Sequence, residues 1–116
     1  MDKRYIYDNR HIAEGDIFYS SWGYDQTNID FYMVKKRIGK GTAEVVPLEN
    51  KIVHEQSTQT TDAVVPYHKE GKPFKCRIKY VYWDNFKQPR IKLSSYQTAH
   101  LWDGNPKHQT NAYYGR

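Results

Sequence analysis

The sequence has little cysteine and no long apolar run. Its single cysteine, Cys76, excludes an internal disulfide. No segment approaches the ~20 consecutive apolar residues of a transmembrane helix. The opening MDKRYIYDNRHIAEG also lacks the apolar stretch of a signal sequence. These absences predict a protein of the reducing cytoplasm with no membrane partner.

Leucine is also scarce, and this favours strands over helices. Only three leucines occur, whereas isoleucine and valine together number fifteen and aromatic residues make up 16% of the chain. Side chains branched at Cβ and aromatic rings suit a pleated sheet, while leucine is favoured on helix faces. A chain of 116 residues has room for one domain. We therefore predict a single, mainly β domain.

Short apolar runs separated by turn residues give the expected layout. Strands are predicted at residues 16–20, 29–36 and 42–48, with a further candidate at 51–57 and a polar loop at 57–62. Pro47 should end or bulge the third strand. Five or six short strands predict a small, partly open barrel of the SH3-like or OB-like kind. The layout is a lead-in at 1–15, a β-barrel core at 16–93, and an ordered but irregular aromatic arm at 94–116.

The cleanest alternation in the chain begins at Phe74. One face of this segment is apolar and the other basic, and the segment 90–93 repeats the pattern. The two segments should pair as an antiparallel hairpin. We call its outward cations the basic hairpin face: Lys75, Arg77, Lys79, Arg90 and Lys92.

The basic hairpin face is the strongest candidate binding surface. Alternate side chains on a strand lie about 6.6 Å apart, a spacing that can follow a phosphate chain or match carboxylates on a facing protein. Nearby rings such as Tyr82 and Trp83 would stack on bases. The net charge of +5 agrees with an acidic partner, although solubility alone explains a charge of this size. The structural alternative is a solvated face whose charges prevent sheet-to-sheet aggregation.

A second candidate surface is the loop between the first two predicted strands. It concentrates rings and amides of the kind found at interfaces, in Trp22, Tyr24, Asp25, Gln26 and Asn28. The favoured interpretation of this loop is structural, with Asx turns at Asp25 and Asn28 and Gly23 allowing the chain to bend. Lys35, Lys36, Arg37 and Lys40 form a further basic cluster, for which solvated turn lysines are the favoured interpretation.

Catalytic and metal sites are not predicted. His100, Asp103 and His108 have no standard zinc spacing. Cys76 falls on the inward face of its strand, where a buried thiol is inert. We therefore expect no catalytic residue, no metal and no cofactor.

Two segments resemble small uncharacterised proteins of bacteriophages and other mobile elements. They are GDIFYSSWGYDQTNIDFYMV at residues 15–34 and LWDGNPK at residues 101–107, followed by a Thr and a Tyr near the end. This resemblance implies a setting, namely host takeover or the blocking of defence systems such as restriction and CRISPR nucleases. It implies no catalytic residue.

Together these features predict a non-enzymatic protein that acts by binding. The first hypothesis is an accessory protein of a phage or mobile element that inhibits a host defence system by binding a host protein, such as a defence nuclease. The second is direct nucleic-acid binding through the basic hairpin face. A third is a small enzyme that uses the Trp22 loop or the histidines. The sequence does not specify an oligomeric state.

Overall fold

The computed structural model describes residues 12–23, 26–83 and 86–111, except the side chains at 82, 83, 86 and 87. Strands dominate this part of the chain, and its single helical element is a short 3-10 turn, η1 (His54–Gln56). The strands are β1 (Ile17–Trp22), β2 (Asn28–Ile38), β3 (Thr42–Ile52), β4 (Thr61–Glu70), β5 (Phe74–Trp83), β6 (Phe86–Lys92), β7 (Thr98–Leu101) and β8 (Lys107–Thr110). The predicted mainly β class is confirmed.

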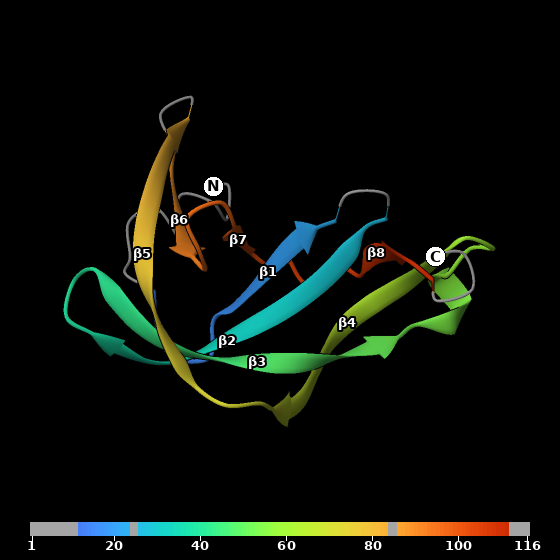
Figure 1. Cartoon of the computed structure of the whole chain (residues 1–116), viewed down its shortest axis with the longest axis horizontal. Coiled ribbons are helices and arrows are strands. Elements are labelled where there is room, and N and C mark those ends of the chain that lie inside the picture. Colours follow the sequence, from blue (N-terminus) through green and yellow to red (C-terminus); the bar gives the residue numbers. More distant parts are fainter. Residues whose placement is uncertain (1–11, 24–25, 84–85, 112–116) are drawn as a thin grey trace.

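Six of the strands form a ring of hydrogen-bonded neighbours. The order is β2, β1, β7, β6, β5 and β3, and β3 pairs again with β2 to close the ring (Figure 1). Inside it lies the first core, which is built from inward residues of every strand of the ring and from Ile12, which precedes β1. Its buried members are Ile12, Phe18, Val34, Ala43, Val45, Cys76, Ile78, Ile91 and Ala99. The prediction of a small, partly open barrel is confirmed.

A second core lies on the opposite face of the long β2–β3 hairpin. Neighbouring residues of a strand point to opposite faces, so Val45 enters the first core and Val46 the second. The buried members of the second core are Ile29, Phe31, Val46, Leu48 and Val64. β4 and β8 cover it, because β3 continues beyond the ring to pair with β4, which pairs in turn with β8.

The C-terminal segment differs from the irregular arm that the sequence predicts. It contributes β7, which lies between β1 and β6 and is part of the ring, and β8, which pairs with β4. The segment 61–70, expected to begin as loop, is the long strand β4. The candidate strand at 51–57 is wrong beyond Ile52, where β3 ends before η1. The irregularity expected near Pro47 is present as a register shift between Leu48 and Glu49.

No helix among the described residues is long and apolar enough to cross a membrane.

Candidate functional site

The predicted hairpin is present as β5 and β6. They pair antiparallel with Arg77 opposite Lys92 and Lys79 opposite Arg90. The inward residue of the same register, Ile91, is fully buried. Because side chains alternate along both strands, burial of the apolar face directs the cations outward. The structure therefore brings together the five residues of the basic hairpin face, with the three on β5 exposed and the two on β6 half-buried.

One of these five cations, Lys75, lies opposite a carboxylate residue, Glu44 on β3, whereas the other four have no acidic residue opposite them in the described part of the sheet. None of the five forms an ion pair with a described carboxylate, although Lys35, Lys69 and Lys107 each do so elsewhere. The Nε atom of Arg90 is buried and has no hydrogen-bond acceptor in that part of the chain. Like charges placed opposite each other on neighbouring strands are unfavourable unless a counterion or an anionic partner compensates them. The surface is therefore suited to binding an anion.

Lys79 and Arg90 belong to a row of residues that lie opposite one another on neighbouring strands, and this row continues on β7 and β1. Arg90 lies opposite His100, which in turn lies opposite Tyr19. Burial, together with the charge of Arg90, lowers the pKa of His100 below its ordinary 6.5. The rings of Tyr19 and His100 lie 5.8 Å apart, and the ammonium of Lys107 lies 4.6 Å from the Tyr19 ring centre. Sequence reasoning missed this continuation, because it depends on β7 entering the ring.

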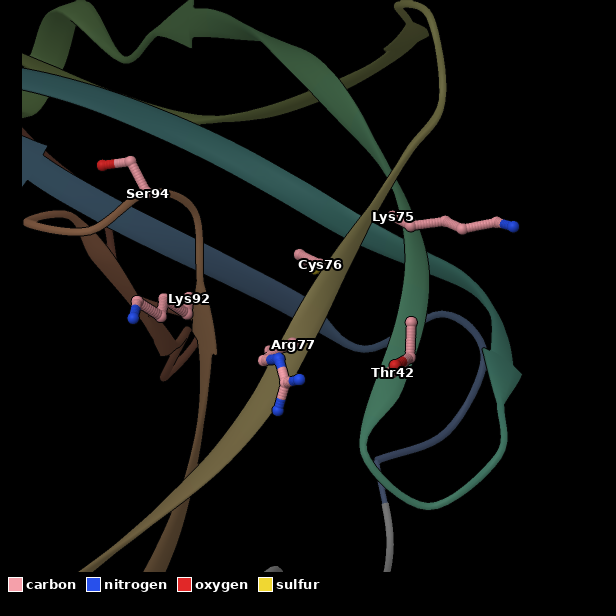
Figure 2. A pocket seen from close by; sticks show the side chains of 6 residues that line it. All are labelled: Thr42, Lys75, Cys76, Arg77, Lys92 and Ser94. Carbon is pink, nitrogen blue, oxygen red and sulfur yellow. The ribbon is translucent and has the colours of Figure 1, made fainter.

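A shallow hollow of about 380 Å³ lies within the basic hairpin face. It is open to solvent and lined by Thr42, Lys75, Cys76, Arg77, Lys92 and Ser94. Figure 2 shows Lys75 extending on the β3 side of β5 and Lys92 on the β6 side, with Arg77 on β5 between them. The sequence pattern placed three of these cations on one face but gave no sign of Thr42 or Ser94, which come from other segments.

The Trp22 loop is tied together by its own contacts. The indole N–H of Trp22 donates to the Asp30 carboxylate, and the Asn28 amide donates to the Trp22 carbonyl at 3.4 Å. Gly23 has φ +133°, and a Cβ there would lie 1.9 Å from the Gln26 carbonyl oxygen, so only glycine fits. Gly23 therefore allows the bend that the structural interpretation expects, whereas the contact of the Asn28 amide with Trp22 is not the expected Asx turn. Trp22 nevertheless remains 48% exposed.

Tyr24 and Asp25, which the sequence also marks as candidate binding residues, lie outside the described residues.

Two residues of the second basic cluster, Lys35 and Arg37, have partners within the fold. Lys35 pairs with Glu70 at 3.0 Å. Arg37 donates to the carbonyls of Gly39 and Lys40, at 3.3 and 2.8 Å, and so closes the turn. Lys36 lies opposite Glu44, whose other neighbour across the sheet is Lys75. A carboxylate position therefore separates this cluster from the basic hairpin face.

The histidines and Cys76 have local roles. Asp103 pairs with Lys107 at 3.2 Å, and the His108 ring lies 3.3 Å from the Thr61 hydroxyl. No three His, Cys, Asp or Glu side chains converge in the described ranges. Cys76 is buried, and burial raises the pKa of its thiol to about 11. A neutral thiol is a poor nucleophile.

The segment at residues 15–34 meets the segment at residues 101–107, and Gln109 just after it, beside the second core. Trp102 lies edge-on to Phe31 with ring centres 5.8 Å apart, and Lys107 lies over Tyr19. The side-chain oxygen of Gln109 accepts from the Ile29 amide at 3.3 Å. These contacts give both segments a structural role in closing the second core.

Comparison of the chain with protein-family models, with curated proteins and with solved structures finds no match.

Proposed function

We propose that this protein binds nucleic acid through the basic hairpin face, as a non-enzymatic accessory protein of a phage or mobile element. The observation that carries the proposal is the set of five clustered cations, none of which forms an ion pair with a described carboxylate. Phosphates supply the missing negative charge, and counterions released from the nucleic acid favour the complex. The mobile-element setting rests on the resemblance of residues 15–34 and 101–107.

Two features favour a phosphate chain as the partner. The cations are arranged in two cross-strand pairs, Arg77 with Lys92 and Lys79 with Arg90. Successive pairs are separated by two residues along the strands, or about 6.6 Å, so a linear polyanion can contact both in turn. Backbone contacts of this kind carry no base sequence information, so the proposal is binding without a strong sequence preference.

The test is salt-dependent binding of labelled duplex DNA and single-stranded RNA, followed by fluorescence anisotropy. Replacing the two exposed lysines of β5 (Lys75→Gln with Lys79→Gln) should weaken binding about tenfold or more. The salt slope should fall by up to about 1.8, because about 0.9 counterions are released per phosphate neutralised on B-DNA. The double variant Lys51→Gln with Lys69→Gln has the same net charge, changes exposed lysines on β3 and β4, and should bind almost as well as the parent. Equal affinities of the two variants, or no binding to either nucleic acid, would contradict the proposal.

A second candidate function is inhibition of a host defence protein, such as a nuclease, by direct binding. The half-exposed ring of Trp22 favours this alternative, because interface hot spots are enriched in tryptophan. A tagged pull-down from host cytoplasm, with and without nuclease treatment, separates a protein partner from nucleic acid. If a protein is captured, Trp22→Phe should retain it and Trp22→Ala should weaken its binding by about 2 kcal/mol or more. Unchanged affinity of Trp22→Ala would remove the loop as the contact.

A further inference from the structure

The outer face of the ring carries a row of four residues, one from each of four neighbouring strands. The strands lie side by side in the order β5, β6, β7 and β1 (Figure 1). Lys79 lies opposite Arg90, and Arg90 lies opposite His100. His100 in turn lies opposite Tyr19. The adjacent residue on each strand is buried in the first core, namely Ile78, Ile91, Ala99 and Phe18. Because side chains alternate between the two faces of a sheet, the row points outward.

His100 carries the ring of this row that a ligand can reach. The Tyr19 ring is covered in part, because the Lys107 ammonium lies 4.6 Å from its centre and the ring packs against the second core. The His100 ring lies beside it, with the ring centres 5.8 Å apart and the planes at 36°. His100 forms no hydrogen bond with another described residue, and neither of its ring nitrogens is buried without a partner. The edge of the imidazole therefore reaches solvent.

Cations lie on two sides of this ring pair, with Arg90 beside His100 and Lys107 beside Tyr19. The Nε atom of Arg90 is buried and has no acceptor among the described residues. Asp103, the carboxylate beside Lys107, is paired with it at 3.2 Å. Burial and the charge of Arg90 hold the pKa of His100 below 6.5, so its ring is neutral at pH 7.5. The row therefore offers a neutral aromatic surface next to cations.

We propose that this face binds single-stranded nucleic acid in preference to duplex, with one base stacked on His100 and the neighbouring phosphates on Arg90 and Lys79. Residues opposite each other on adjacent strands are about 4.8 Å apart, so one nucleotide can place its phosphate at Arg90 and its base at His100. Aromatic rings beside a cationic path are the combination that binds single strands, because every base has a face that stacks. The inference rests on the proposed function and adds to it the form of nucleic acid that is bound.

Charge alone predicts the opposite preference. Duplex DNA carries one negative charge per about 1.7 Å of its axis, and each strand carries one per about 3.4 Å. A surface that binds through lysine and arginine only would therefore bind duplex more tightly than a single strand. In a duplex the bases stack on one another, so the ring of His100 has no base face to contact. The order of the two affinities thus distinguishes stacking from charge.

The first experiment changes the ligand and leaves the protein as it is. Fluorescence anisotropy at pH 7.5 and one salt concentration compares a single strand, its duplex, and a single strand of equal length in which abasic spacers replace the nucleosides. The single strand should bind about tenfold more tightly than the duplex. The abasic strand keeps the phosphates and lacks the bases, so it should bind about tenfold more weakly than the complete strand, the loss expected from one stacked base.

The second experiment changes the ring and leaves the charge at pH 7.5 unchanged. His100→Leu removes the aromatic plane, and the ratio of duplex Kd to single-strand Kd should fall about tenfold. His100→Phe keeps a plane and should keep most of this ratio. His68→Leu, which changes an exposed histidine on β4, is the matched control and should keep the ratio of the parent. A loss of stability in His100→Leu lowers both affinities by the same factor, so the ratio still reports stacking.

The outcomes separate this preference from the wider proposal. If all three ligands bind with a steep salt dependence but the duplex is bound as tightly as the single strand, the preference is wrong and nucleic-acid binding stands. If the single strand is preferred but His100→Leu and His68→Leu give the same ratio, the stacking position at His100 is wrong. If no ligand binds, the proposed function is wrong, and the preference with it.

Discussion

His100 is half-buried beside Arg90, and this position makes the fold sensitive to mild acid. Burial and the Arg90 charge hold the pKa of His100 below 6.5 in the folded protein. As the pH falls, the unfolded chain therefore takes up this proton first. The free energy of unfolding has its full His100 contribution above about pH 6.5 and loses it as the pH falls toward the lower, folded-state pKa.

The corresponding prediction compares urea denaturation at pH 7.5 and pH 5.5. The parent should lose stability between the two values, and His100→Gln, which cannot take up a proton, should lose less. An equal loss in both proteins would show that other groups cause the decrease. Bound polyanion should oppose the effect, since phosphates near Arg90 offset the charge that lowers the pKa of His100.

Cys76 gives a second prediction at the residue scale. With a pKa of about 11, only about one thousandth of the thiol is ionised at pH 8, and its side chain is also buried. A thiol-specific disulfide reagent should therefore react slowly with the native protein and rapidly in denaturant. Rapid labelling of the native protein, at the rate of a small free thiol, would refute the buried position on β5.

At the scale of elements, the β5–β6 hairpin is the part of the fold that the sequence predicts best. Its alternation from Phe74 to Tyr80 is regular enough to assign both faces, and the two strands pair antiparallel as expected. β7 and β8 were missed because each is only four residues long: KHQT contains no apolar residue, and the alternation of TAHL is too short to be distinctive. Their strand conformation depends on neighbours that are distant in the sequence. The hollow was missed for the same reason, since Thr42 and Ser94 meet β5 only through the pairing of other strands.

The two faces of the hairpin should respond differently to substitution. Ile91 is fully buried, so Ile91→Ala should lower the free energy of unfolding by about 2–5 kcal/mol, from lost burial and the cavity left behind. Lys79 is exposed on the same hairpin, and Lys79→Gln should change stability by no more than about 0.5 kcal/mol. Urea denaturation measures both. Similar losses for the two variants would contradict the two-faced hairpin.

At the scale of the whole molecule, the arrangement of two cores on one hairpin decides how the protein unfolds. β2 and β3 run through both parts, with Val45 in the first core and Val46 in the second. The C-terminal strands also divide between the parts, since β7 completes the ring and β8 covers the second core. Complete unfolding of either core would therefore remove β2 and β3, which also enclose the other core. The sequence shows apolar residues on both faces of the second and third strands but does not show which segments cover them.

Because the two cores share β2 and β3, we predict that they unfold together. Val64 is fully buried in the second core, and Val64→Ala should cost roughly 2 kcal/mol. Native-state hydrogen exchange should then show the same loss of protection for slow amides in β4 and for those around Ile91 in β6, because global unfolding exposes both. Loss confined to β4 and β8 would mean that the second core opens alone. In that case the ring that carries the basic hairpin face would remain folded, and Val64→Ala would leave nucleic-acid affinity unchanged even where the second core is open.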